Sequence, residues 1–259
     1  MPSFYAGVDV GAATVEAVIM QDSSVSGYSI MSSGAMLALS AQAVLGKALK
    51  EAGIFMEDLR YIVATGWGRE SITFANKIIT EITCHATGAH FLIPGTRSVI
   101  DIGAQDSKAI SVDEDGRVTS FAMNDKCAAG TGRFLEVMAG VLEVNLEELG
   151  SIALTSKNPC PINSTCTVFA ETEATGYRAQ GKATNDIILG LIEAMVRRVV
   201  QMGRPIGYRK EVVFTGGVAK NIGVKKALEK EIGLDILVPE EPQIVGALGA
   251  ALLAKREAG

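Results

Sequence analysis

The sequence predicts an α/β protein of two lobes, each a mixed sheet with helices. Three observations predict this fold: an internal repeat of a strand–turn–strand segment, an order in which each repeat is followed by helices and a further strand, and 28 glycines, which suit tight turns and close strand–helix packing. Hydrophobic residues make up 48% of the chain and charged residues 20%, so the chain can bury a core and is not disordered.

The internal repeat is the strongest of these signals. The segments FYAGVDVGAATVEAVIM (4–20) and SVIDIGAQDSKAISV (98–112) share an apolar strand, an Asp, a Gly, a small residue and a second apolar strand. Each copy is typical of a β-hairpin whose turn carries the Asp and the Gly. The copies are too far apart for a solenoid unit, and they therefore indicate two similar lobes.

The elements between the two hairpins follow from periodicity and breakers. Apolar spacing predicts a helix over 35–53, and IFMEDLRYIVATGWGRE returns to a strand at 61–64. The segment ITEITCHATGAHFLIP (79–94) predicts a helix that ends near Pro94. Its neighbours Cys84 and His85 within this segment resemble a metal-binding pair. Adjacent residues on a helix do not face each other, so we assign both to helix packing.

The second half continues in the same style. After the second hairpin the pattern predicts a helix over 131–142, a short helix over 146–153, a loop with prolines over 155–166 and a long helix over 184–202. A strand, a glycine turn and a helix start follow over 211–221, and a strand, a proline loop and a final helix over 235–255. We expect lobe I to hold residues 1–95 with the C-terminal helix at about 242–259. Lobe II then holds 96–241, including the cysteine-bearing segment 124–170.

Charge and the chain start narrow the function classes. The net charge of −5 argues against nucleic acid or an anionic membrane as the main partner. The N-terminal residues lack a basic region followed by a long apolar run, so no signal peptide is expected. No apolar run reaches the length of a membrane span, and we expect a cytoplasmic protein.

The two Asp-x-Gly turns suit a polyphosphate. Glycine lets backbone N–H groups approach phosphate oxygens, and an Asp at a strand end can hold Mg²⁺. A third element, FTGGVAKN (214–221), offers a flat glycine surface for a purine and ribose. Two such hairpins facing each other predict a clamp that holds the polyphosphate of a nucleotide, with Mg²⁺, from both sides.

This trio resembles the actin, sugar-kinase and heat-shock ATPase superfamily. The resemblance implies catalytic roles for Asp9, Asp101 and Gln105. It also implies that three segments contact the nucleotide. They are the first phosphate loop (Gly11, Ala12, Ala13), the second phosphate loop (Gly103, Ala104) and the adenosine motif (Gly216, Gly217, Asn221).

Two of the four cysteines stand in distinctive places. Cys127 precedes a small-residue loop and the predicted helix 131–142, and Cys166 lies in a Thr-rich stretch after the proline loop. A helix N-terminus stabilises a thiolate. Two thiolates are too few for a closed cluster or a structural zinc site, but a two-fold dimer would double them. A buried structural role is the alternative for any one of these cysteines.

The order of the motifs then indicates a narrower family. NDKCAAGTGRFLEVMA, STCTVFAE, ATGWGR, CHATGA, DIGAQD and TGGVAKN together resemble the ATP-dependent activators of 2-hydroxyacyl-CoA dehydratases, in a wider family that includes activating subunits of benzoyl-CoA reductases. The resemblance spans residues 5–255. It implies that Cys127 and Cys166 ligate one 4Fe–4S cluster that bridges a homodimer.

The same resemblance implies a mechanism and partners. A ferredoxin or flavodoxin would reduce the cluster. ATP hydrolysis would then rearrange the lobes, and the electron would pass at low potential to an iron–sulfur dehydratase or a double-cubane-cluster protein.

The sequence departs from the family pattern at four places. Where the first loop often reads DxGSTxxK, this chain has Ala12, Ala13 and Glu16, and Ala104 replaces the middle glycine of GGQD. Gln105 remains as the candidate for positioning the attacking water.

Other functions stay open at this point. The acceptor could be another double-cubane or benzoyl-CoA-reductase-type partner. A small-molecule kinase of the same superfamily would need a catalytic base in the cleft and would hold no iron. A nucleotide-gated regulatory module would bind nucleotide equally well without Cys127 and Cys166.

Overall fold

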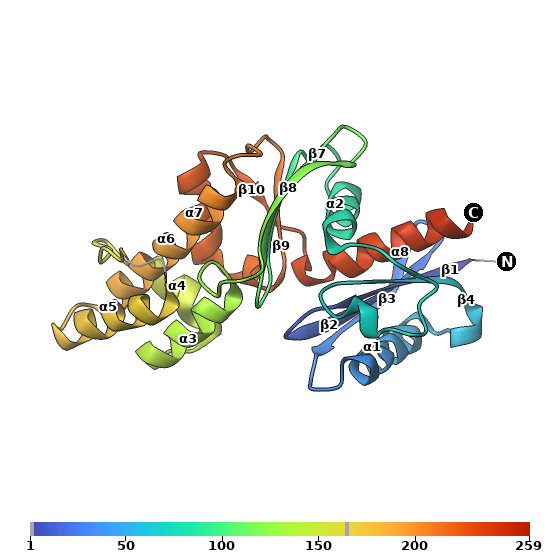
Figure 1. Cartoon of the computed structure of the whole chain (residues 1–259), viewed down its shortest axis with the longest axis horizontal. Coiled ribbons are helices and arrows are strands. Elements are labelled where there is room, and N and C mark those ends of the chain that lie inside the picture. The colour runs from blue at the N-terminus through green and yellow to red at the C-terminus, as the bar shows by residue number, and fades with distance from the viewer. Residues whose placement is uncertain (1–2, 164–165) are drawn as a thin grey trace.

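The computed structural model describes residues 3–163 and 166–259 and contains two five-stranded sheets (Figure 1). The first sheet has the order β3-β2-β1-β4-β5, with β1 Phe4–Val10, β2 Thr14–Gln21, β3 Ser24–Ser32, β4 Leu59–Thr65 and β5 Lys77–Ile78. The second has the order β10-β9-β6-β7-β8, with β6 Ser98–Ile102, β7 Ser107–Val112, β8 Val118–Asn124, β9 Val212–Thr215 and β10 Ile236–Leu237.

The two sheets share one topology. In each, the first three strands form an antiparallel meander, and the next two strands run parallel to the first. Asp9 pairs with Glu16 across the first hairpin, and Asp101 pairs with Lys108 across the second. The predicted two-lobed α/β fold and both hairpins are confirmed. The third strand of each meander, β3 and β8, was not predicted.

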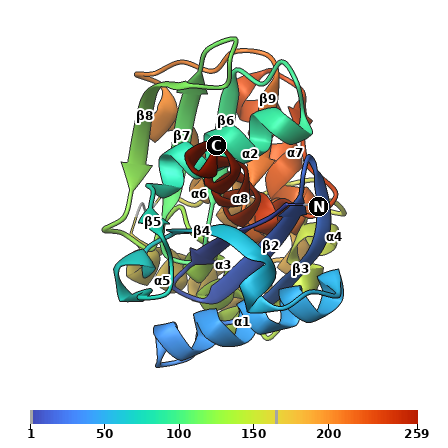
Figure 2. The same cartoon turned by 90° about the vertical axis from the view of Figure 1, so that its right-hand side faces the viewer.

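Helices cover the sheets on both faces. α1 (Leu37–Ala52) covers one face of the first sheet and α8 (Val245–Ala258) covers the other, while α2 (Glu81–Leu92) lies between α8 and the second sheet (Figures 1 and 2). On the far side of the second sheet, α6 (Thr184–Gly203) packs on β7 and β8, and α7 (Ile222–Ile232) packs on α6.

Three further helices extend the second half. They are α3 (Gly132–Leu142), α4 (Leu149–Ala153) and α5 (Thr167–Ala179), and α3 packs against α5. The sequence predicts α3 and α4 well but does not predict α5. Ser164 and Thr165, which belong to the predicted loop and to the STCTVFAE segment, lie outside the described residues. Short 3₁₀ helices complete the described fold at Met56–Asp58, Arg69–Ser71, Leu146–Glu148, Gly217–Lys220 and Pro242–Ile244.

The two central helices meet at unusually short range. A Cβ built on Gly249 of α8 would overlap the carbonyl oxygen of Cys84, and a Cβ on Gly88 of α2 would overlap that of Val245. Glycine is therefore required at both positions, because any side chain would push the helices apart. Since α8 packs on β1 and β4 while α2 contacts β6 and β7, this pair joins the two halves.

Two expectations on organisation remain. α8 packs on the first sheet, and the division into lobe I (1–95 with the C-terminal helix) and lobe II (96–241) stays a prediction. In the described ranges no helix combines the length and the apolar character needed to cross a bilayer.

Replacement of Gly249 by Ala tests the helix contact. We expect Gly249→Ala to lower the free energy of unfolding by about 1–3 kcal/mol, as overpacking of a close contact does. Gly46→Ala is the matched control, since Gly46 is exposed within α1 and a Cβ there meets nothing within 4 Å. It should raise stability by about 0.5–1 kcal/mol through helix propensity. Urea unfolding measures both, and equal stability of the two variants would contradict the packing argument.

Candidate functional site

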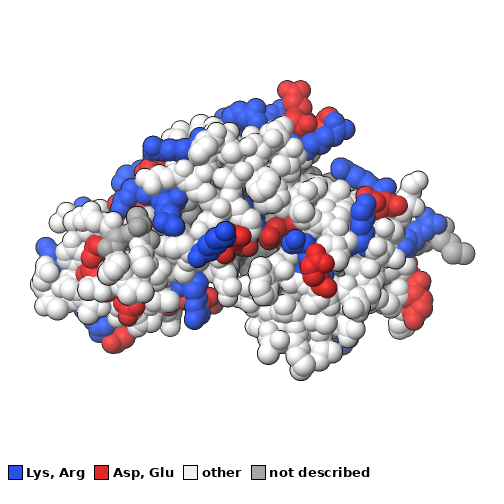
Figure 3. Space-filling model, in the orientation of Figure 1, with Lys and Arg blue, Asp and Glu red and all other residues white. Residues whose placement is uncertain are grey.

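A cleft of about 910 Å³ opens between the two halves. In the space-filling view the halves meet in a notch, with basic and acidic side chains gathered above it (Figure 3). The cleft is lined by every residue to which the sequence assigned a catalytic or nucleotide-binding role, from both sheets: Asp9, Gly11, Ala12, Ala13, Asp101, Gly103, Ala104, Gln105, Gly216, Gly217 and Asn221. The structure brings these residues together, and their individual roles stay predictions.

The two hairpin turns have the same backbone geometry. The N–H of Gly11 donates to the carbonyl of Thr14 at 2.9 Å, and the N–H of Gly103 donates to the carbonyl of Asp106 at 3.0 Å. The repeat seen in the sequence is therefore a structural repeat, with one turn on each side of the cleft.

Asp101 is fully engaged by its neighbours. Its carboxylate accepts from Lys108 Nζ at 3.0 Å and from the Thr215 hydroxyl at 2.8 Å. Burial alone would raise the pKa of Asp101, but His85, Lys108 and Thr215 together lower it to about 2.

Lys108 gathers three carboxylates around one ammonium group. Besides Asp101, its Nζ lies 2.7 Å from Asp106 and 3.1 Å from Glu81, the first residue of α2. The side chain is only 2% exposed. Burial by itself would lower the pKa of Lys108, but the three carboxylates outweigh burial and raise it. Lys108 therefore stays charged and anchors the second loop to α2.

Asp9, at the equivalent place in the first hairpin, has the opposite environment. Its cross-strand partner is Glu16 rather than a lysine, and both side chains are buried. Burial raises the pKa of Asp9 to about 6, although the neighbouring His85 opposes this shift. Burial, and then the charge of Asp9, raise the pKa of Glu16 well above its usual value. The first hairpin is thus poor in positive charge.

Two residues of the site were missed by the sequence analysis. Lys108 was passed over as a strand residue, and His85 was assigned to helix packing together with Cys84. That assignment holds for Cys84, which is fully buried in the core and whose pKa burial raises to about 12. For His85 it is incomplete, because the side chain is buried on α2 but also lines the cleft between Asp9 and Asp101. Helical spacing places His85 four residues after Glu81, and this was the available signal.

The third predicted element lies at the end of β9. Gly216 has a φ of 84°, and a Cβ there would lie 2.5 Å from the carbonyl oxygen of Ile102. The strand end can therefore approach β6 closely only as glycine. Asn221 caps α7, because its Oδ1 accepts from the Val224 N–H at 3.0 Å.

The charge of the described cleft lining is predominantly negative. Its cationic side chains are Lys108, which is already paired with three carboxylates, and Lys220, which pairs with Glu241 at 2.9 Å. Its carboxyl groups belong to Asp9, Glu16, Glu81, Asp101, Asp106, Glu136 and Glu147. A polyphosphate in this cleft therefore depends on backbone N–H groups and on an added cation.

The second loop is bonded directly to α3. The N–H of Gly132 donates to the carbonyl of Gly103, and the N–H of Arg133 donates to the carbonyl of Ala104, both at 2.8 Å. These are the first two residues of α3, whose preceding loop carries Cys127. The loop is held in turn by Asn124, whose Nδ2 donates to the Cys127 carbonyl at 2.8 Å.

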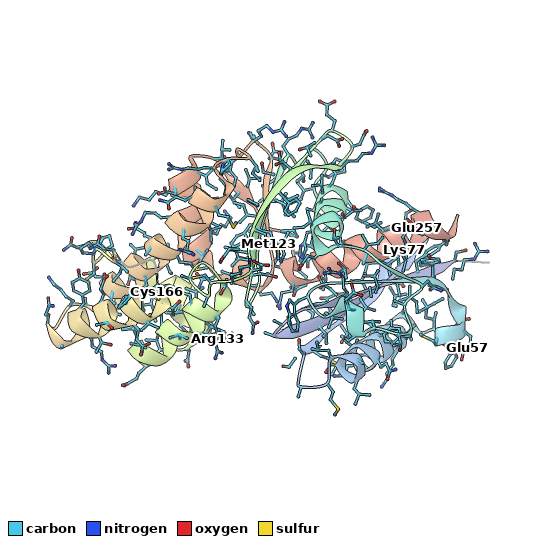
Figure 4. All side chains as sticks on the ribbon, viewed as in Figure 1. Glu57, Lys77, Met123, Arg133, Cys166 and Glu257 are labelled. Carbon is cyan, nitrogen blue, oxygen red and sulfur yellow. The ribbon has the colours of Figure 1, made fainter. Side chains whose placement is uncertain are left out.

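The four cysteines divide into two classes. Cys84 and Cys160 are buried, whereas Cys127 is half-buried and Cys166 is exposed. Cys166 occupies the N-cap position of α5, in the half of the molecule that also carries Arg133 on α3 (Figure 4). Among the described residues, no group of three or more His, Cys, Asp or Glu side chains is placed to hold a metal ion within one chain.

The contrast between Asp9 and Asp101 gives a prediction for stability. Native Asp9 keeps its proton between about pH 4 and 6 whereas the unfolded chain releases it, so stability falls as pH rises through this window. In the absence of metal, the free energy of unfolding of Asp9→Asn should therefore exceed that of the wild type by up to about 3 kcal/mol above pH 6. Below pH 4 the two should be equally stable.

Asp101→Asn is the matched control and should have the opposite sign. Because the native pKa of Asp101 is lowered to about 2, its ionised form stabilises the fold above pH 4, and the variant should lose about 2 kcal/mol at pH 7. Chemical unfolding in EDTA across pH 3–8 measures both variants. The same sign for both would refute the electrostatic contrast.

Comparison with known proteins places these features in a family. The BadF/BadG/BcrA/BcrD ATPase family matches residues 6–254. The activator of lactoyl-CoA dehydratase from Anaerotignum propionicum is 46% identical over 252 residues, which cover 96% of each chain. The structure of the activator of the 2-hydroxyisocaproyl-CoA dehydratase from Clostridium difficile, with bound ADPNP, superposes with a TM-score of 0.93 at 43% identity, covering 100% of this chain and 96% of that one.

A more distant structure supports the fold alone. A ROK family glucokinase from Streptomyces griseus superposes with a TM-score of 0.61 at 11% identity, over 98% of this chain and 100% of that one. The sugar-kinase-like fold is thereby confirmed. With a family match over nearly the whole chain and relatives above 40% identity, the chain belongs to the BadF/BadG/BcrA/BcrD ATPase family.

Proposed function

We propose that this chain is an ATP-hydrolysing iron–sulfur protein that activates a 2-hydroxyacyl-CoA dehydratase by electron transfer at low potential. The observation that carries the proposal is the pair of hydrogen bonds from Gly132 and Arg133 to the second phosphate loop. They join the predicted nucleotide site to the helix beside Cys127. The activators among its relatives support the same function.

The nucleotide would lie in the cleft between the two hairpins. Backbone N–H groups of Ala12, Ala13, Ala104 and Gln105 would face its phosphates, since those of Gly11 and Gly103 are bonded within the turns. The first loop offers no hydroxyl at positions 12 and 13 and no lysine at position 16. Bound Mg²⁺ would neutralise phosphate charge. Asp9 is the better carboxylate to hold it, because Asp101 is already paired with Lys108. Gln105 would orient the attacking water, yielding ADP and phosphate.

The two cysteines outside the core, half-buried Cys127 and exposed Cys166, fit a site shared between two copies of the chain. Each chain supplies two thiols just before two helices that pack together, α3 and α5, and the described part of one chain offers no complete metal site. Val168 and Phe169, each 64% exposed beside Cys166, would be covered by a second copy. A 4Fe–4S cluster held by Cys127 and Cys166 of both copies would supply one-electron transfer. Ferredoxin or flavodoxin would be the donor and the iron–sulfur dehydratase the acceptor.

Iron content tests this proposal most directly. Anaerobically purified protein should contain about two irons and two acid-labile sulfides per chain, with a 4Fe–4S EPR signal after reduction. Cys127→Ser and Cys166→Ser should each lose both, whereas Cys160→Ala, at a buried cysteine, should retain them. An iron-free dimer that still hydrolyses ATP would refute the electron-transfer function and favour a regulatory ATPase.

Replacement of Gly132 tests the link between the loop and α3. A Cβ there would lie 3.1 Å from the Gly103 carbonyl oxygen and 3.3 Å from Ala104 Cα, so the loop must shift by a few tenths of an ångström. Gly132→Ala should lower ATP-dependent electron transfer by about 2- to 30-fold, the range of mutations that alter coupling between sites, and by more than it lowers the affinity for nucleotide, whose phosphates the same loop faces.

Gly140→Ala is the matched control for this test, because Gly140 lies on the same helix in open space. It should leave both nucleotide binding and electron transfer unchanged. Equal electron-transfer rates in the two variants would show that α3 does not carry the coupling.

A further inference from the structure

One imidazole spans the two halves of the cleft. His85 lies on α2, and its Nδ1 is 3.4 Å from Asp101 Oδ1 while its Nε2 is 3.8 Å from Asp9 Oδ2. Asp9 is the penultimate residue of β1 in the first sheet, and Asp101 is the penultimate residue of β6 in the second. The ring is therefore in contact with equivalent carboxylates of both hairpins, and its side chain is only 7% exposed.

The hydrogen bond of Thr215 fixes the orientation of the ring. The Thr215 hydroxyl has one hydrogen, which it donates to Asp101 Oδ1 at 2.8 Å. At 3.3 Å from His85 Nδ1, its oxygen must then accept, so we assign the hydrogen to Nδ1. The Nδ1 edge is thus tied to the second half, and the Nε2 edge faces Asp9.

The start of α8 closes this contact from the other side. A Cβ on Gly246 would overlap Asp9 Oδ2 and lie 2.9 Å from His85 Nε2. Only glycine leaves room for the carboxylate and the ring to meet beneath this helix. Three elements, β1, α2 and α8, therefore converge on one pair of side chains.

The two contacts of the ring differ in kind. The oxygens of Asp101 are occupied by Lys108 and Thr215. Asp9 meets His85 at a distance too long for a hydrogen bond, so its oxygens remain available to a cation. The ring can orient this carboxylate without consuming its ligand positions.

We propose that His85 is a positioning residue of the nucleotide site, which holds Asp9 in register with the second phosphate loop so that Asp9 can bind the metal ion of the bound nucleotide. This role rests on the proposed ATPase function. His85 acts through Asp9 and does not itself touch the nucleotide. Residues that orient a metal ligand commonly contribute 10- to 100-fold to metal affinity.

The test measures metal binding apart from turnover. Mn²⁺ is titrated into the ADP-bound protein and free Mn²⁺ is followed by EPR, while ADP affinity in EDTA and the melting temperature are recorded separately. His85→Leu removes both polar edges at similar volume. His85→Asn keeps a donor near the Nδ1 position, and His90→Leu, on the same helix but outside the cleft lining, is the matched control.

The proposal predicts a graded result. His85→Leu should weaken Mn²⁺ binding by about tenfold or more, with ADP affinity in EDTA unchanged and ATP hydrolysis lowered in kcat. His85→Asn should recover part of the loss, because the Asp101 side is restored, and His90→Leu should match the wild type.

Other outcomes would overturn it. Mn²⁺ affinity in His85→Leu equal to the wild type would show that the ring only fills space. If losses in Mn²⁺ affinity merely follow losses in melting temperature across the variants, including His85→Asn, the role is structural. Failure of the wild type to bind Mn²⁺ with ADP would instead refute the proposed ATPase site, and the role of His85 with it.

Discussion

The close contact between α2 and α8 is the constraint on which the rest of the structure depends. α8 packs on the first sheet and α2 contacts the second. The contact between these two helices therefore sets how the two sides of the cleft lie relative to each other. Gly88 and Gly249 allow the two backbones to touch. A wider separation would draw His85, which lies on α2, away from Asp9, which lies on β1 of the first sheet.

A symmetric backbone here carries asymmetric chemistry. Both hairpins place an Asp at a strand end, and both are flanked by a parallel strand that ends in Thr-Gly, at Thr65 and at Thr215. The residue across the strand decides what each Asp can do. Lys108 makes Asp101 a permanent structural anion, whereas Glu16 leaves Asp9 without a fixed counter-charge. Pairs of carboxyl groups whose pKa values are pushed apart are typical of sites that divide labour.

Much of this arrangement could be predicted from the sequence, because it depends on local signals. Asp-x-Gly turns between apolar strands specify hairpins, and the glycine turn after β9 specifies close approach to a neighbouring strand. The sequence did not predict β3 and β8, because their exposed faces break the apolar pattern. It did not predict α5, because that helix buries only Ala170 and Ala174 among its described side chains. His85 could not be placed, since Asp9 and Thr215 are distant from it in the sequence and only the tertiary fold brings them together. Lys108 was missed although the predicted hairpin sets it opposite Asp101 and two residues after Asp106.

The hydrogen bonds between the second phosphate loop and α3 set an energy threshold. A rotation of the Gly103 and Ala104 peptides would break two bonds, at a net cost of about 1–3 kcal/mol. The contact between the loop and α3 is therefore about as strong as the coupling free energies found between two sites. It is firm enough to hold α3 against thermal fluctuation for most of the time, yet a ligand that prefers the rotated peptides by a few kcal/mol can release it.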